Sequence, residues 1–174
     1  MIEIKHGLGG AVARPLALLA LLCAGCSLTG LPVTPLSPET LAVPGRLARQ
    51  TETGLPVVRL RAGSGLVIAE VARTPLQKAA GLASRPRLAQ DDGMLFVNQY
   101  PQRAVYNTRD TLMPLSCAYI AADGTVLELH DMNARDMSPV VSVSDRVQYV
   151  LEVNRGWFRQ HGVRAGDRIA VEDP

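Results

Sequence analysis

LSCAYIAADGTVLELH (residues 115–130) predicts a β-hairpin. Two apolar runs, residues 115–121 and 125–130, flank Asp123-Gly124. Asp-Gly between apolar runs is a strong signal for a tight hairpin turn, because such turns need positive φ. We expect this hairpin to form the centre of a β-sheet, from which the rest of the fold extends.

Two further apolar runs flank the hairpin. GMLFV (93–97) is continuously apolar, which is typical of a buried strand. RVQYVLEV (146–153) alternates between apolar and polar positions, which is typical of a strand with one buried face. The residues expected on that buried face are Val147, Tyr149, Leu151 and Val153.

The segment before residue 93 adds two strands and a helix. Residues 56–60 and 66–72 predict strands that are joined by a Gly-Ser-Gly turn at 63–65. Thr74-Pro75 is a favourable helix start, since Thr caps well and Pro suits the first helical position. The residues of this helix region expected to face the core are Leu76, Ala79, Ala80 and Leu82.

A second helix is predicted directly after residue 153. Asn154 is expected to be its N-cap, Trp157 and Phe158 its core anchors, and Gly162 its end. Residues 168–171 predict a final strand. Many short strands with only two short helices predict a mainly β (α+β) fold, a compact β-barrel or a closed, bent sheet.

Length and charge limit the classes of function. A chain of 174 residues is expected to be one domain with appendages. The formal net charge is only +2, and the sequence has no basic stripe with interleaved aromatic residues. Nucleic acid is therefore not an expected partner.

The N-terminal segment predicts export and lipid attachment. Residues 15–22 (PLALLALL) form an apolar run that is too short to span a bilayer, and Cys-Ala-Gly-Cys follows directly. This arrangement resembles the bacterial lipobox, although Cys23 occupies a position where Leu is usual. The resemblance implies a signal peptide over residues 1–25 and acylation of Cys26, for example with palmitate. An ordinary secretory signal peptide and an uncleaved anchor are the alternatives.

Residues 26–55 are rich in proline and have no sustained apolar period. We expect them to form a tether that holds a folded domain (residues 56–174) away from the membrane. The membrane is thus an expected partner through the lipid on Cys26. Ser27 follows that cysteine, and by resemblance to enterobacterial sorting rules it favours the outer membrane, facing the periplasm.

Several motifs in the domain resemble the family called Domain of Unknown Function 192. They are GMLFV, DTLMPL, an Asp-Gly hairpin, YVLEVNRGWFRQHGVRAGDRI and, upstream, EVARTP followed by AGL. The resemblance extends over about residues 56–172. It implies a small, mainly β fold, often behind a signal peptide, with no established activity.

One segment departs from the family pattern. Relatives usually have Phe-Trp-Met-Lys-Asn-Thr before Leu-x-Pro-Leu, whereas residues 106–111 here are Tyr-Asn-Thr-Arg-Asp-Thr. Only Thr111 is kept. If the family has a common site, Thr111, Glu152 and Asn154 are the residues most expected to keep it, and Arg109 and Asp110 are less expected to do so.

These five residues are the candidate site. The Arg109 guanidinium suits a carboxylate or phosphate. Asp110 and Glu152 could act as a carboxylate pair, and Thr111 and Asn154 add neutral hydrogen-bonding groups. Together they would form a small concave site for a polar or anionic ligand, and we expect a non-enzymatic module that is either envelope-accessory or small-ligand-binding. A small hydrolase-like enzyme that uses Asp110, Glu152 and Arg109 is the alternative.

A purely structural interpretation of the same residues is also open. Arg109 could pair with an acid, Thr111 could cap a turn, Asn154 could cap the second helix, and Glu152 could face solvent.

Cofactor and metal sites are not expected. Cys117 lies in an apolar strand, as a buried inert thiol would, and no motif supports a pair with His130 or His161. The histidines and methionines match no metal-ligand spacing, and no phosphate-binding glycine loop is present.

Overall fold

The computed structural model describes residues 33–37, 39–42 and 53–172. Cys26, the predicted signal peptide and residues 43–52 lie outside this range. The described strands are β1 (Val33–Pro35), β2 (Val57–Ala62), β3 (Gly65–Ala72), β4 (Asp92–Gln102), β5 (Val105–Tyr106), β6 (Leu115–Ile120), β7 (Val126–Met132), β8 (Val140–Val141), β9 (Val147–Asn154) and β10 (Ile169–Glu172). The helices are the 3-10 turn η1 (Thr40–Ala42), α1 (Pro75–Ala80) and α2 (Trp157–Gln160).

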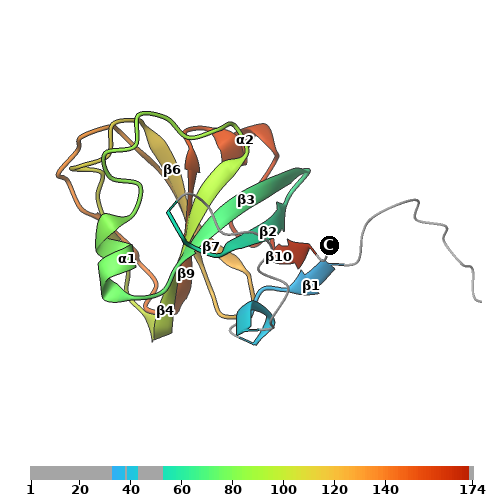
Figure 1. Cartoon of the computed structure of the whole chain (residues 1–174). Helices are drawn as coiled ribbons and strands as arrows, with labels where there is room; N and C mark the ends of the chain where they lie inside the picture. The colour runs from blue at the N-terminus through green and yellow to red at the C-terminus, as the bar shows by residue number, and fades with distance from the viewer. Residues whose placement is uncertain (1–32, 38, 43–52, 173–174) are drawn as a thin grey trace, which may run out of the picture.

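Eight strands form one strongly curled sheet in the order β1-β10-β2-β3-β4-β9-β6-β7 (Figure 1). All neighbours are antiparallel except β3 and β4. The sheet curls so far that Thr125, next to β7, forms a bridge with Arg168, next to β10. The prediction of a mainly β fold with a bent, closed sheet is therefore confirmed. β5 and β8 pair separately as a small ribbon.

The sheet is buried on both faces. One large apolar cluster includes Leu95, Ala118 and Leu151, whereas a second cluster on the other face includes Met94, Cys117 and Val150. Alternate residues of β4, β6 and β9 thus enter different cores, as the two-residue period of a strand requires. The expectation of one buried face on residues 146–153 is too simple: Tyr149, Leu151 and Val153 share the first cluster, but Val147 belongs to the second.

Part of the predicted tether packs on the domain. β1 pairs with β10, and the side chains of Leu36 and Leu41 are buried in the first apolar cluster. The Arg73 guanidinium also donates a hydrogen bond of 2.8 Å to the carbonyl oxygen of Leu41. Residues 33–37 and 39–42 are therefore structural components of the domain rather than spacer.

The first helix begins at the predicted residues, but it does not pack against the core as the sequence predicts. The Thr74 hydroxyl accepts from the Gln77 backbone N–H (3.2 Å), and the Gln77 side chain accepts from the Thr74 N–H (3.0 Å). This is a capping box. However, α1 buries none of its residues, and Leu76 is 81% exposed. Of the four residues expected in the core, only Leu82, beyond the helix, is buried.

The second helix is anchored as predicted and capped differently. Trp157 and Phe158 are buried, and the indole N–H of Trp157 donates to an Asp91 carboxylate oxygen at 2.9 Å. The N-cap is Gly156, at φ +84°, and not Asn154. The prediction for Asn154 is wrong because β9 continues through that residue, which pairs with Leu115. In the described part of the chain, no helix has the length and hydropathy needed to cross a bilayer.

Candidate functional site

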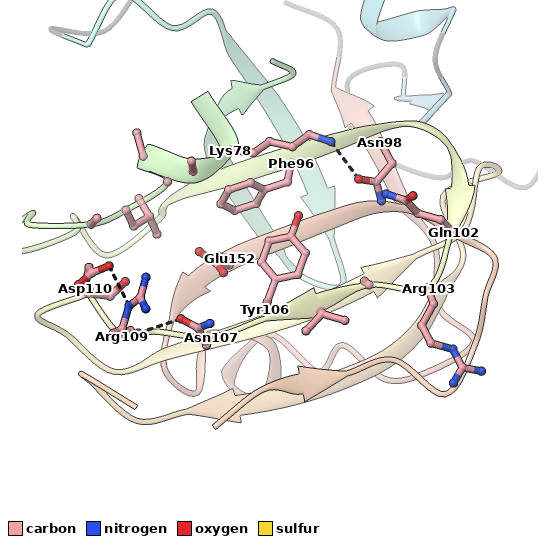
Figure 2. A pocket seen from close by; sticks show the side chains of 18 residues that line it. Lys78, Phe96, Asn98, Gln102, Arg103, Tyr106, Asn107, Arg109, Asp110 and Glu152 are labelled. Carbon is pink, nitrogen blue, oxygen red and sulfur yellow. Dashed lines mark hydrogen bonds and ion pairs between the residues drawn. The ribbon is translucent and has the colours of Figure 1, made fainter. Parts of the chain in front are cut away.

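A cavity of about 510 Å³ lies over the second apolar face of the sheet, between α1, β4, β5 and residues 107–111 (Figure 2). It brings together four of the five predicted site residues, Arg109, Asp110, Thr111 and Glu152. The other polar side chains that line it are Lys78, Asn98, Gln102, Arg103, Tyr106 and Asn107.

Glu152 is the buried acid of this cavity. β9 places it between Met94 of β4 and Cys117 of β6, which are its partners in the strand register. Its residue surface is only 4% exposed, so the alternative that it faces solvent is wrong. Burial raises the pKa of the Glu152 carboxyl to about 8. No side chain or backbone group of the described residues forms a hydrogen bond or ion pair with this carboxyl.

Tyr106 stands beside Glu152 in the same cavity (Figure 2). Its ring packs edge-on against Phe96, with the ring centroids 5.1 Å apart. Burial, and then the nearby Glu152, raise the pKa of the Tyr106 hydroxyl well above its ordinary value. Like the Glu152 carboxyl, this hydroxyl has no hydrogen-bond partner within the described ranges.

Lys78 reaches the cavity from α1. Its ammonium group donates to the Asn98 side-chain oxygen at 2.9 Å, and partial burial lowers its pKa. Asn98 is itself fixed, because its amide donates to the Val147 carbonyl oxygen at 3.1 Å and its own backbone carbonyl accepts from the Gln148 side chain. The position of the Lys78 cation is therefore set by Asn98 of β4, an interior strand of the sheet.

Arg109 and Asp110 form a local pair at the rim. The Arg109 Nε lies 3.4 Å from an Asp110 carboxylate oxygen, and the two side chains are 61% and 67% exposed. The Asn107 side chain accepts from the Arg109 backbone N–H at 3.1 Å, which fixes the turn. An exposed pair of this kind contributes little to stability. Arg109 is thus paired with an acid, as the structural interpretation expects, while it also lines the cavity.

The neighbouring threonines hold the rim in place. Thr111 is buried, its backbone N–H donates to the Thr108 carbonyl at 2.9 Å, and its carbonyl accepts from the Arg135 N–H at 3.1 Å. The Thr108 hydroxyl donates to the Asn133 carbonyl oxygen. These contacts tie residues 108–111 to the loop after β7.

Asn154 lies apart from the cavity-lining residues. Its side-chain N–H₂ group is close to three backbone carbonyl oxygens, those of Leu88 (3.3 Å), Ala89 (2.7 Å) and Gln90 (3.2 Å). It therefore holds the loop before β4 in place. Asn154 therefore does not join the other four predicted site residues at the cavity.

Cysteine chemistry and metal binding receive no support from the geometry. Burial raises the pKa of the Cys117 thiol to about 12, and the nearby Glu152 adds to that shift. His130 lies in register opposite Cys117, but its Nε2 is 3.1 Å from a Glu128 carboxylate oxygen. Among the described residues, no three His, Cys, Asp or Glu side chains converge as metal ligands.

A second hollow of about 410 Å³ lies between β7 and α2. Its central polar groups, Ser116 and Asp131, already have partners within the protein. The Ser116 hydroxyl donates to Asp131 and accepts from the Gly156 N–H, and Asp131 lies 3.7 Å from Arg155 and 3.9 Å from Arg159. The first cavity encloses the Glu152 carboxyl and the Tyr106 hydroxyl without such partners, and it is the stronger candidate.

Comparison with known families matches residues 58–171 to DUF192, a family described as "Uncharacterized ACR". The chain belongs to this family. The matched residues include β3 to β9, most of β2 and β10, and every cavity-lining residue. No curated protein matches the chain.

Two solved structures share the fold. One is a protein of unknown function from Novosphingobium aromaticivorans, with a TM-score of 0.63 and 29% identity; the match covers 67% of this chain and 86% of that one. The other is a putative transcription regulator from Sinorhizobium meliloti, with a TM-score of 0.61 and 34% identity; this match covers 66% of this chain and 92% of that one.

Sequence reasoning missed Tyr106, Lys78 and Asn98 as cavity residues. Tyr106 stands out in the sequence only as a departure from the family pattern, and a polar aromatic residue at that position is the available signal. Lys78 and Asn98 carry no sequence signal, because only the fold brings α1 next to the middle of β4.

Proposed function

We propose that this DUF192 protein is an exported, lipid-anchored, non-enzymatic binding module of the cell envelope, whose cavity takes a small polar or anionic ligand. The observation that carries the proposal is the pair of polar groups enclosed in the cavity, the Glu152 carboxyl and the Tyr106 hydroxyl, which have no partner among the described residues.

Buried polar groups without partners are costly. Leaving one such group unsatisfied costs about 1–3 kcal/mol, and folded proteins satisfy nearly all of them. Among the described residues, the side-chain atoms that are both cut off from water and without a hydrogen-bond partner are the Tyr149 hydroxyl and the His161 Nε2. The Glu152 carboxyl and the Tyr106 hydroxyl instead face the cavity. A ligand with complementary polar groups can therefore reach these two groups and form hydrogen bonds with them. A cavity of about 510 Å³ is also within the ordinary size range of small-molecule sites.

A thermal-shift screen tests ligand binding. Sugars, small organic acids, amines and metal ions are added to the protein, and a true ligand raises the melting temperature through mass action. Tyr106→Phe removes only the hydroxyl, and Arg109→Ala removes a rim cation, so both should reduce the shift. Arg87→Ala removes an exposed arginine away from both hollows and serves as the matched control. A shift that is the same in all variants would place the ligand elsewhere.

A hydrolase-like activity that uses Asp110, Glu152 and Arg109 is the second candidate. One observation favours it: the pKa of Glu152, raised to about 8, suits a general acid near neutral pH. Against it, Asp110 is exposed and already paired with Arg109. Release of nitrophenol from nitrophenyl esters and glycosides distinguishes the two. The binding proposal predicts no turnover above that of Glu152→Gln, whereas an enzyme would lose its activity in this variant.

The envelope part of the proposal is supported by the sequence around Cys26. Replacement of Cys26 by Ser should abolish palmitate labelling and move the protein from the detergent phase to the aqueous phase. The Ser27 position supports placement in the outer membrane, facing the periplasm. Ser27→Asp should then shift the protein to the inner membrane on fractionation. A wild-type protein without the palmitate label would contradict lipid anchoring.

A further inference from the structure

We propose that the ligand is a small organic carboxylate and that Glu152 binds it as a neutral acid, by donating a hydrogen bond. This inference rests on the proposed function, that the cavity binds a ligand, and names the chemical class of that ligand.

The groups around the cavity favour an anion. Lys78, Arg103 and Arg109 are cationic lining residues, and Asp110 is the one lining carboxylate apart from Glu152 among the described residues. Of the three cations, Arg103 points away from Tyr106 and Glu152 and donates to the Val143 carbonyl oxygen at 3.2 Å (Figure 2). Asp110 is engaged with Arg109, and the Asn98 side-chain oxygen accepts from Lys78, but each contact uses only one of the several N–H groups of its cation. The polar groups that remain for a ligand are therefore mostly hydrogen-bond donors, which suits an acceptor that carries negative charge.

The surroundings of Glu152 favour its neutral form. The elements packed against it present Met94 from β4, Cys117 from β6 and Tyr106 from β5, and none of these is a cation. The charged groups of the same cavity, Lys78, Arg103, Arg109 and Asp110, make no ion pair with Glu152. Burial without a positive partner keeps a carboxyl protonated at pH 7. A protonated carboxyl can donate its O–H group to a ligand.

A carboxylate ligand uses this arrangement better than the other classes do. It would accept a charge-assisted hydrogen bond from the Glu152 O–H and a second bond from the Tyr106 hydroxyl. A neutral sugar would gain little from the cationic rim, and an ammonium ligand would be repelled by it. The rings of Phe96 and Tyr106 form an apolar wall for an organic body, so an organic anion fits better than an inorganic one.

Proton linkage follows from this binding mode. If only the neutral form of Glu152 accepts the anion, the affinity is full below the pKa of Glu152 and falls as the pH rises through it. Between pH 7 and pH 9 the neutral fraction of a group with a pKa near 8 falls about tenfold, and the association constant should fall by the same factor.

Isothermal titration of the full chain in neutral detergent tests the proposal. The probes are benzoate, its uncharged counterpart benzamide and the cation benzylamine, each at pH 7 and pH 9. We expect benzoate to bind most tightly and to weaken about tenfold at pH 9. Lys78 also loses charge toward alkaline pH, so the variant Glu152→Gln is needed to separate the contribution of Glu152 to the pH dependence from that of Lys78. The amide side chain of this variant keeps a donor at every pH, so the part of the pH dependence that Glu152 causes should disappear.

The outcomes are distinct. Equal binding of benzamide or tighter binding of benzylamine would overturn the proposal that the ligand is a carboxylate (the anion proposal). A benzoate affinity that does not change between pH 7 and pH 9 would overturn the proposal that Glu152 binds the carboxylate as a neutral acid. If benzoate fails but a sugar or amine from the thermal screen binds in a Tyr106-dependent way, the anion proposal falls and the binding function stands. If no compound of any class binds, both fall. Lys78→Ala, which should weaken benzoate more than benzamide, replaces Glu152→Gln if that variant does not fold.

Discussion

Glu152 on β9 lies directly opposite Cys117 on β6 in the antiparallel register, so both side chains occupy the same buried face of the sheet. Burial is the first cause of both pKa shifts, which bring the carboxyl to about 8 and the thiol to about 12. Both groups are thus uncharged at neutral pH. A neutral carboxyl next to an apolar core is the feature of this molecule with the most direct consequences.

The first prediction concerns stability and pH. The pKa of Glu152 is about 8 in the folded protein and near the ordinary 4.5 in the unfolded chain. Between these values the folded state keeps a proton that the unfolded state loses, so the wild-type free energy of unfolding falls as the pH rises, until the pH passes 8. Glu152→Gln lacks this dependence. Urea unfolding should show similar stabilities at pH 4 and a variant more stable by on the order of 3 kcal/mol at pH 7. A difference that does not vary with pH would refute this.

The second prediction concerns the thiol. Because Cys117 is fully buried and its pKa is raised to about 12, it should not react with iodoacetamide at pH 8 in the folded protein. It should react fully in urea. Mass spectrometry of the peptide that contains Cys117 gives the readout, independently of Cys23 and Cys26. Rapid labelling without denaturant would show that this face of the sheet is accessible.

The third prediction concerns the segment before the family domain. Leu36→Ala removes a fully buried side chain from the first apolar cluster and should cost about 2–5 kcal/mol of unfolding free energy. Leu76→Ala on α1 is the control, because that side chain is 81% exposed and should change stability by less than about 0.5 kcal/mol. Equal stabilities of the two variants would mean that Leu36 is not packed in the first apolar cluster.

The fourth prediction concerns an ion pair between β3 and the loop after α1. Arg85 donates two hydrogen bonds, of 2.6 and 2.9 Å, to the two carboxylate oxygens of Glu70, a buried residue. Removal of one partner of a fully buried pair typically costs about 3–5 kcal/mol. Arg85 is partly exposed and Glu70 also accepts a hydrogen bond of 2.7 Å from the Thr53 hydroxyl, so Arg85→Ala should destabilise the protein by up to about 3 kcal/mol. The exposed Arg87→Ala is the control. No difference between the two variants in chemical unfolding would contradict the ion pair.

Much of the fold is predictable because it depends on local rules. The Asp-Gly turn, the apolar run at 93–97 and the Thr74-Pro75 helix start each specify a structure within a few residues, and each is present. The errors concern tertiary context. The apolar character of Leu76 predicts a core position, but α1 is too short and too peripheral to be covered.

The candidate site is harder to predict than the fold, because it depends even more on tertiary context. The alternation of residues 146–153 leaves Glu152 pointing away from one core, and nothing within that segment indicates a second core on that side. The burial of Glu152, and hence its raised pKa, depends on β5 and α1, which are distant in sequence. Local sequence favours Asn154 as the N-cap of a helix. In the structure, its side chain instead donates to backbone carbonyl groups that are more than sixty residues away in the sequence.

The most direct test of the account is a carbon-13 NMR titration of the Glu152 side-chain carboxyl in the folded protein, assigned by comparison with Glu152→Gln. We predict a carboxyl that stays protonated at pH 7 and titrates with a midpoint near pH 8. A midpoint near 4.5 would show a solvated or paired carboxylate, and would contradict both the burial of Glu152 and its binding of a ligand as a neutral acid.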